Sequence, residues 1–431
     1  MEKILTDEEA KNMACVHAAD ILLPAGGIDV ERWAVIACDQ FTSQPEYWER
    51  VEQYVGDAPS TLHMIYPEVY LGNEDEAAYT QRLAGIQMNM RRYLAEGILT
   101  EEVHEGYVLT VRETEAGTRV GLIGALDLET YDYVRDSTSM VRATEETVRE
   151  RIPVRVGIRK SALVESPHVM MLLDDASCKL LEPLYQKKAE FRRLYDTELM
   201  FGGGNVCGYA VEGVEAEALT EKLVSMEQES SEIFLAVGDG NHSLAAAKTC
   251  WEKLKESLTE DEIRTHPARY ALVEVVNLHN SSLEFEAIHR VLYGGEMNAV
   301  TEGLKLYLES CGQYKVVECS DEREADIVFV QGECRIGLRL FQTEGHLAVE
   351  LLQHFLDGYL RDNPEARIDY VHSKEAVEEL CKEENACGML LRPIDKSSLF
   401  PAIYAGGVLP RKTFSIGTEY QKRYYMECRR L

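Results

Sequence analysis

Apolar residues recur along this chain with two periods that alternate, which predicts strands interleaved with helices. Strands are expected at residues 33–38, 106–112, 120–126, 167–173, 206–211, 233–239 and 270–277. Helices are expected over 76–96, 179–195 and 215–229, in the segment that carries Trp48 and Val51, and from residue 241 onward. This order of elements is typical of a mixed α/β fold.

The stretch 233–248 contains the sharpest change of pattern. An apolar run ends at Gly238-Asp239-Gly240, and an alanine-rich helical pattern follows directly. We expect a strand, a tight turn and a helix N-terminus there. The first amides of such a helix have no partners within it, and its dipole is positive at that end, so the turn can bind a phosphate. Asp239 and His242 would stand beside it, able to hold a metal or move a proton.

A simpler interpretation of this turn is a helix N-cap, which stabilises a helix by ~1 kcal/mol. A cap needs one polar residue, whereas here Asp239 is followed by Asn241, His242 and Ser243. The excess of polar groups favours a functional site.

Residues 139–159 concentrate arginine in an acidic chain, and the planar guanidinium group suits phosphate or carboxylate. The alternation in 155–159 predicts a strand with Arg155 and Arg159 on one face. We expect at least one arginine of this segment to bind an anion. The alternative is a solvated helix face with pairs such as Glu145 with Arg149.

Other polar positions are weaker candidates. Asp39, in Cys38-Asp39-Gln40, follows the first predicted strand, where chemistry is common, but it also fits an ordinary strand end. His168 is expected to be packed and hydrogen-bonded. Arg411-Lys412 either reaches a phosphate or is solvated charge.

The pattern changes near residue 295. Residues 296–375 alternate helix and strand patterns without polar motifs, so we place a boundary between a motif-bearing region, 1–294, and a C-terminal α/β region, 295–431. Motif-like sequence returns at 409–415, so the tail of the second region can return to the site.

Composition narrows the function classes. The chain has 431 residues and a formal net charge of −30, which argues against nucleic-acid binding, because phosphate backbones select basic surfaces. No apolar run approaches the ~20 residues of a membrane span, and we see no secretory signal. The 11 cysteines form no Cys-x-x-Cys pair, which indicates free thiols in a reducing compartment and a cytoplasmic protein. The P-loop, the nucleophile elbow and the His-Glu-x-x-His motif are absent from the sequence.

The ordered motifs resemble the bacterial domain-of-unknown-function family 1015 (DUF1015) over nearly the whole chain. The motifs that carry this resemblance are Cys38-Asp39-Gln40-Phe41-Thr42-Ser43, Arg142-Ala143-Thr144-Glu145 with Pro153-x-Arg155, Pro167-His168, Gly238-Asp239-Gly240-Asn241-His242-Ser243 and Leu409-Pro410-Arg411-Lys412-Thr413. The glycine-aspartate-glycine turn is also similar to that of the ParB-like superfamily, which includes ParB partition proteins, sulfiredoxin and free-serine kinases.

The resemblance implies a ParB-like core that places nucleotide phosphates on this turn. In the free-serine kinases the turn typically reads Asp-Gly-His-His-Arg, and its aspartate assists phosphoryl transfer. Asp239, Gly240 and His242 match that pattern, whereas Asn241 and Ser243 stand where the kinases have a histidine and an arginine.

Two other superfamily activities are not supported. The turn has no sulfiredoxin-type cysteine, and we find no helix-turn-helix that would indicate a ParB-like DNA role. A cation for the phosphate would have to come from Arg142, Arg155 or Arg411 in place of the missing arginine.

The leading hypothesis is a phosphotransferase between an adenine nucleotide and a small hydroxylated metabolite, with serine or phosphoserine as the best analogy. ATP or ADP and Mg²⁺ are implied, with Asp239 as metal ligand or hydroxyl-orienting group and His242 as a donor to phosphate or a proton carrier. Glu68, Glu145 and Asp39 are candidate acids or bases. The expected phosphate-binding residues are Gly238, Gly240, Asn241, Ser243, Arg142, Arg155, Arg411 and Lys412.

Two other functions stay open at this point. One is a nucleotide-binding regulator without transfer chemistry, and the other is a metal-dependent small-molecule phosphatase. The expected partners are a small-molecule substrate and a nucleotide, without nucleic acid or membrane. The oligomeric state is open, a homo-oligomer included.

Overall fold

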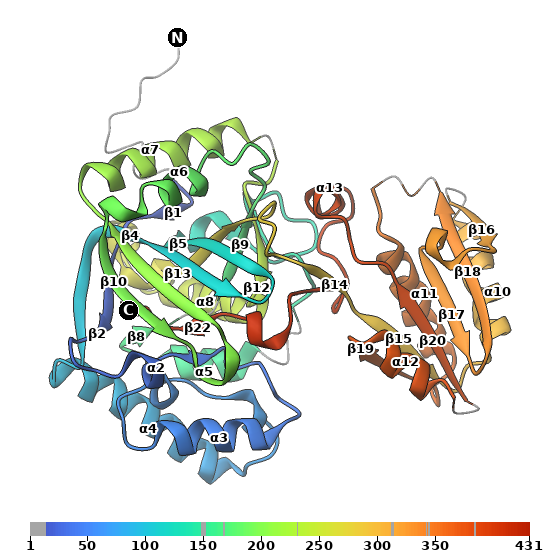
Figure 1. The fold of residues 1–431 in the computed structure, drawn as a ribbon, viewed down its shortest axis with the longest axis horizontal. Coiled ribbons are helices and arrows are strands. Elements are labelled where there is room, and N and C mark those ends of the chain that lie inside the picture. The colour runs from blue at the N-terminus through green and yellow to red at the C-terminus, as the bar shows by residue number, and fades with distance from the viewer. Residues whose placement is uncertain are drawn as a thin grey trace. The chain divides into compact units, whose positions relative to one another are not determined.

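The computed structural model confirms a mixed α/β fold and divides the chain into two units. One unit comprises the residues up to Glu284 together with Gly417–Leu431, and the other comprises Phe285–Ile416 (Figure 1). The second unit is therefore inserted near the C-terminal end of the first, whereas the sequence pattern alone suggested a boundary near residue 295. The structure describes residues 14–147, 152–166, 169–230, 232–311, 314–341, 343, 345–382 and 385–431.

A large mixed sheet forms the centre of the first unit (Figure 1). Its strands follow the order β10 (Arg192–Glu198), β11 (Asn205–Val211), β4 (Leu99–Thr114), β5 (Gly117–Asp127), β13 (Tyr270–Asn277), β9 (Met170–Leu173), β12 (Leu235–Asp239), β7 (Val141–Arg142) and β6 (Tyr131–Asp132). Outside this path, β1 (Val16–His17) pairs with β5 and β2 (Ala19–Pro24) with β4. β12 lies between β9, which is antiparallel to it, and β7, which is parallel.

Most helices of the first unit bury an apolar face against the rest of the unit. The helices are α2 (Val30–Trp33), α3 (Pro45–Val55), α4 (Glu76–Ala95), α5 (Ile152–Arg159), α6 (Leu181–Gln186), α7 (Val214–Glu229), α8 (Asn241–Lys255) and α9 (Glu260–Thr265), of which α9 buries no residue. The largest apolar core includes Trp33, Trp48 and Tyr93, all almost fully buried. Each described helix is too short or too polar to cross a bilayer.

The segment after the second unit returns to the first and pairs with early parts of the chain. β22 (Tyr424–Tyr425) pairs with β3 (Val35–Ile36), and β23 (Arg429–Arg430) pairs with β8 (Val164–Glu165). These short antiparallel pairs fix residues 417–431 to the first unit.

The second unit has its own sheet and its own core. The sheet order is β16 (Lys315–Cys319), β18 (Cys334–Phe341), β17 (Ile327–Gln331), β20 (Ala386–Leu391), β15 (His289–Tyr293) and β19 (Arg367–Val371), and β14 (Phe285–Ala287) pairs separately with β21 (Phe414–Ile416). The helices are α10 (Met297–Ser310), α11 (Ala348–Asp362), α12 (Lys374–Leu380) and α13 (Lys396–Gly406). Leu304 and Leu356 are fully buried in a core that also contains Phe329.

Short 3₁₀ helices connect several of these elements in both units. They are η1 (Thr61–Met64), η2 (Glu68–Tyr70), η3 (Leu128–Thr130), η5 (Lys188–Glu190), η6 (Met200–Gly202), η7 (Pro267–Arg269), η8 (Glu322–Glu324) and η9 (Glu419–Gln421).

Three local predictions were wrong. The predicted strand 33–38 is mostly absent, because Asp29 caps the short helix α2, which ends at Trp33, and only Val35–Ile36 pair as a strand. The predicted helix 179–195 stops at Gln186, and residues 192–198 form β10, since their backbone groups bond to β11. The predicted strand 155–159 belongs to α5. Its alternation suits both periods, and packing of Ile152 and Val156 against α8 decides for the helix.

Candidate functional site

The Asp239 turn has the predicted strand-turn-helix form. β12 ends at Asp239, α8 begins at Asn241, and Gly240 between them has a φ of 84°, a conformation that favours glycine. The Asp239 carboxylate accepts the Gly240 N–H at 2.9 Å. The Gly240 carbonyl accepts the N–H groups of Ser243 and Leu244, each at 3.0 Å. The Gly240 and Ser243 N–H groups are thus bonded within the turn, and Asn241 and His242 supply the N-terminal amides of α8 beside Asp239.

A neighbouring loop supports this turn from the side. The pairing of β12 with β9 skips Gly238, so the strand bends just before Asp239. The buried Thr144 hydroxyl donates to the Val237 carbonyl at 2.7 Å and accepts from the side-chain amide of Asn241 at 3.4 Å. Thr144 belongs to the Arg142–Glu145 motif, so two motifs far apart in sequence build one turn.

Lys422 lies next to Asp239, and the sequence analysis missed it. Its Nζ is 3.4 Å from the Asp239 Oδ2, and the two side chains are 11% and 22% exposed. The Arg112 guanidinium donates to the carbonyls of Lys422 and, at 2.7 Å, Tyr420, while Arg119 donates to the Gln421 carbonyl at 2.8 Å. Lys422 lies outside every motif that we identified, so no local signal pointed to it.

A buried network of charges lies behind Lys422. Arg423 donates to Glu274 at 2.9 Å and to Glu427 at 2.5 Å, and all three side chains are at most 6% exposed. Burial alone would raise the pKa of Glu274, but Arg423 and Arg119 outweigh it and hold that pKa below its ordinary value. Burial lowers the pKa of Arg119, which Glu274 and Asp239 partly offset.

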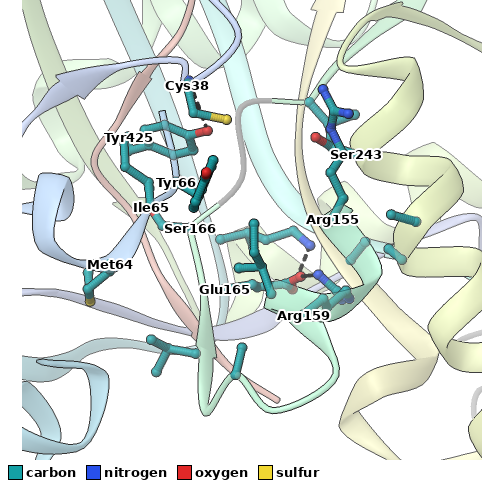
Figure 2. Close-up of a pocket in the computed structure, with 18 of the residues that line it drawn as sticks. Cys38, Met64, Ile65, Tyr66, Arg155, Arg159, Glu165, Ser166, Ser243 and Tyr425 are labelled. Atoms are coloured by element: carbon teal, nitrogen blue, oxygen red, sulfur yellow. Dashed lines mark hydrogen bonds and ion pairs between the residues drawn. The ribbon is translucent and has the colours of Figure 1, made fainter. Parts of the chain in front are cut away.

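A cavity of about 150 Å³ begins at the first turn of α8. Its wall is largely apolar and includes residues of α4, α5 and α8. Figure 2 shows Cys38 and Tyr425 on one side of it and Arg155 and Ser243 on the other. Ser243 belongs both to the Asp239 turn and to the cavity wall, so the turn and the cavity adjoin.

Two predicted site residues meet in this cavity. The Arg155 guanidinium donates to the Glu68 carboxylate, and the two side chains are 11% and 9% exposed. Arg159, one turn further along α5, binds the buried Glu165 at 2.5 Å. Arg155 and Arg159 do share a face, as predicted, but the reason is the four-residue spacing of a helix.

Cys38 lies on the opposite side of the cavity from Arg155 (Figure 2), and Asp39 follows it in the chain. The Tyr425 hydroxyl accepts the Cys38 N–H at 3.2 Å, and the Asp39 carboxylate accepts from Gln40 at 2.9 Å. Burial, followed by the Asp39 charge, raises the pKa of the Cys38 thiol to about 12. A protonated thiol is a poor nucleophile, so these surroundings do not favour thiol chemistry at Cys38.

The remaining predicted residues differ in their surroundings. The Arg142 guanidinium donates to the carbonyls of Ser139 and Glu232, at the start of β12 and therefore at the opposite end from Asp239. Glu145 is half-buried just beyond Thr144. The exposed Arg411 and Lys412 belong to the second unit. His168, Arg149 and Arg151 lie outside the described residues.

The Asp239 turn offers an anion a set of helix amides and a lysine, with one carboxylate beside them. Within the described residues, the one cluster of three candidate metal ligands is the exposed set Asp20, Glu101 and His104, away from this turn. Mg²⁺ is usually held by one or two carboxylates together with substrate phosphates and waters. Asp239 fits such a site as a single protein ligand.

Solved structures with a similar chain path share low sequence identity with this chain. Free serine kinase in complex with AMP is 13% identical with a TM-score of 0.38, covering 71% of this chain and 90% of that one. A mutant of free serine kinase in complex with ADP is 12% identical with a TM-score of 0.38, covering 71% and 91%. SbnI from Staphylococcus aureus, with a C-terminal truncation, is 9% identical with a TM-score of 0.35, covering 68% and 82%. No curated protein matches the chain significantly.

A protein-family model extends over both units. It is described as a protein of unknown function, DUF1015, and it matches residues 22–359. The matched span includes the Asp239 turn, the Glu68–Arg155 pair and the first part of the second unit, and it ends before Lys422. Since the match covers more than half of the sequence, this chain belongs to the DUF1015 family.

Proposed function

We propose that the chain transfers a phosphoryl group between an adenine nucleotide and a small hydroxylated metabolite, with serine or phosphoserine as the first pair to test. The observation that carries the proposal is the Asp239 turn. It combines the N-terminus of α8 with an adjacent carboxylate, Asp239, and an adjacent lysine, Lys422. Helix N-termini with adjacent cations are common phosphate sites in proteins.

The chemistry needs few groups, because phosphoryl transfer depends mainly on positioning and charge stabilisation. The acceptor oxygen bonds to the γ-phosphorus, the bond from that phosphorus to the β–γ bridging oxygen breaks, and the hydroxyl proton leaves to a base. Amides of Asn241 and His242 would hold phosphate oxygens, and Asp239 would orient the hydroxyl or take its proton. Mg²⁺, held by Asp239 and the phosphates, would neutralise charge on the phosphate oxygens.

The cavity supplies space for a bound small molecule next to this turn. It begins at Ser243 and contains the paired Glu68 and Arg155. Glu68 is therefore a second candidate for the general base, and His242, in the first turn of α8, is a candidate donor to phosphate.

The test is an assay in both directions, with serine plus ATP and phosphoserine plus ADP, extended to a panel of hydroxylated metabolites. Asp239→Ala should abolish turnover. Asp261→Ala removes a carboxylate that is 97% exposed and should leave turnover unchanged. If the wild type and Asp239→Ala are equally inactive across the panel, the proposal fails. Nucleotide binding without turnover would instead indicate a regulator, and phosphate release without nucleotide would indicate a phosphatase.

A further inference from the structure

The segment that follows the second unit carries a cation into the Asp239 turn. Lys422 belongs to residues 417–431, which return to the first unit, and its Nζ lies 3.4 Å from the Asp239 carboxylate. The side chain is 11% exposed, so this amine is largely removed from water. Placing an ammonium group there costs desolvation energy, which calls for an explanation.

Anchoring the tail does not explain this placement. The backbone on both sides of Lys422 is already held by Arg112, which donates to the carbonyls of Tyr420 and Lys422, and by Arg119, which donates to the Gln421 carbonyl. β22 then pairs with β3 directly after this segment. The ion pair at 3.4 Å adds little to such an anchor, because the desolvation cost of the buried ammonium offsets much of its Coulomb attraction.

The charges around the turn are not balanced. The cations Arg112, Arg119, Lys422 and Arg423 face the carboxylates Asp239, Glu274 and Glu427. Among the described groups joined by these contacts, four cations against three carboxylates leave an excess positive charge. Arg119 is only 4% exposed, and no described residue accepts a hydrogen bond from its Nε. An anionic ligand would remove this imbalance.

We propose that Lys422 is a phosphate-binding residue of this site, with its Nζ turning from Asp239 to an oxygen of the ligand phosphate. The inference rests on the proposed function and adds to it a residue from outside the matched family span. Lysine suits the role, because its ammonium sits on a flexible stem and bonds in any direction. Asp239 holds the amine in position, and its own negative charge opposes the phosphate unless Mg²⁺ neutralises it.

Two kinds of variant give opposite predictions. Lys422→Gln should weaken ADP binding about 10- to 100-fold, the usual effect of losing a hydrogen bond to a charged group, and leave adenosine binding within about twofold. Lys422→Arg should retain most of the ADP affinity. In Mg²⁺-free buffer Asp239→Asn should tighten ADP binding, because a negative charge next to the phosphates is removed, while turnover with Mg²⁺ is lost. The matched control is Lys253→Gln, which removes the same charge from an exposed position near the end of α8.

Calorimetric titration with ADP, adenosine and pyrophosphate separates the outcomes. If Lys422→Gln binds ADP as tightly as Lys253→Gln, this inference is overturned while the proposed function stands. A further outcome is that the wild type binds pyrophosphate but neither ADP nor adenosine, with the pyrophosphate binding lost in Lys422→Gln. In that case the phosphate role of Lys422 stands and the adenine-nucleotide proposal fails. If the wild type binds none of the three probes, both fail. An equal loss for ADP and adenosine would indicate a structural role and would also overturn the inference.

Discussion

Arg423→Met tests whether the buried charge network holds the first unit together. Arg423 donates to Glu274 at 2.9 Å and to Glu427 at 2.5 Å, and these three side chains are 6%, 4% and 0% exposed. Removing one partner of a buried ion pair typically costs ~3–5 kcal/mol, because the other charge stays in the interior without compensation. Here one substitution removes the arginine partner of two buried carboxylates, Glu274 and Glu427. We therefore expect a loss near the upper end of that range, or about 5–15 °C in melting temperature for a unit of this size.

The pH dependence gives the same variant a second signature. In the wild type the pKa of Glu274 lies below its ordinary value of 4.5, so its contribution to stability is present above that pH and is lost on acidification. Without Arg423 we expect burial, the largest single influence, to outweigh the remaining attraction of Arg119 and to raise that pKa. A raised pKa reverses the sign, and stability is then lost as pH increases through the new value. The stability gap between wild type and variant should narrow from pH 8 to pH 5.

The assay can report on the first unit alone. All three tryptophans, Trp33, Trp48 and Trp251, are buried in that unit, so the fluorescence change on thermal or urea unfolding follows its core. Arg430→Met is the matched control, since Arg430 is exposed in the same segment and its loss should change stability by about 0.5 kcal/mol or less. Equal stability of the two variants at pH 8, or a gap that widens at pH 5, would refute the reasoning.

Four further predictions follow from the same contacts. Gly240→Ala should cost ~1–2 kcal/mol, because φ is 84° there, whereas Gly26→Ala should cost less, since its added Cβ meets open space; thermal melts compare them. Glu68→Gln and Arg155→Gln should show a coupling of about 0.5–3 kcal/mol in a double-mutant cycle, and additive effects would contradict the pair. At pH 8 iodoacetamide should label the exposed Cys311 and Cys334 well before Cys38, whose thiol pKa is raised to about 12; fast labelling of Cys38, measured by peptide mass spectrometry, would count against this assignment. A chain ended at Ile416 should lack the cooperative tryptophan transition of the full chain, and a normal transition would show that residues 417–431 are dispensable.

The parts of the site that sequence reasoning found are those built from neighbouring residues. The Asp239 turn could be predicted because an apolar run, two glycines and an alanine-rich helix follow one another within a few residues. The helices predicted over 76–96 and 215–229 were also confirmed. They could be predicted because their apolar spacing is a local pattern that is regular over several turns. Local patterns failed at 155–159, where the spacing suits a strand and a helix equally and packing on α8 decides.

Contacts between distant segments could not be predicted from one sequence. Glu68 and Arg155 were each nominated by their chemistry, and only the fold brings them together. The sequence around Lys422 has no distinguishing pattern. Its position depends on the pairing of β22 with β3 and on the hydrogen bond from Arg112 to its carbonyl. The chemical roles of the proposed site residues stay predictions until activity is measured.

The inserted topology has a consequence for how this protein matures. Glu165 and Glu274 are synthesised early, but their arginine partners Arg429 and Arg423 come only after the whole second unit. The second unit has an apolar core made from its own residues, so it can fold before the first unit is complete. Until the tail is synthesised, we expect these carboxylates of the first unit to stay hydrated. The larger unit would then be the later one to fold, and synthesis that stops within the second unit would leave a first unit without Arg423 and Arg429, two of the cations that neutralise its buried carboxylates.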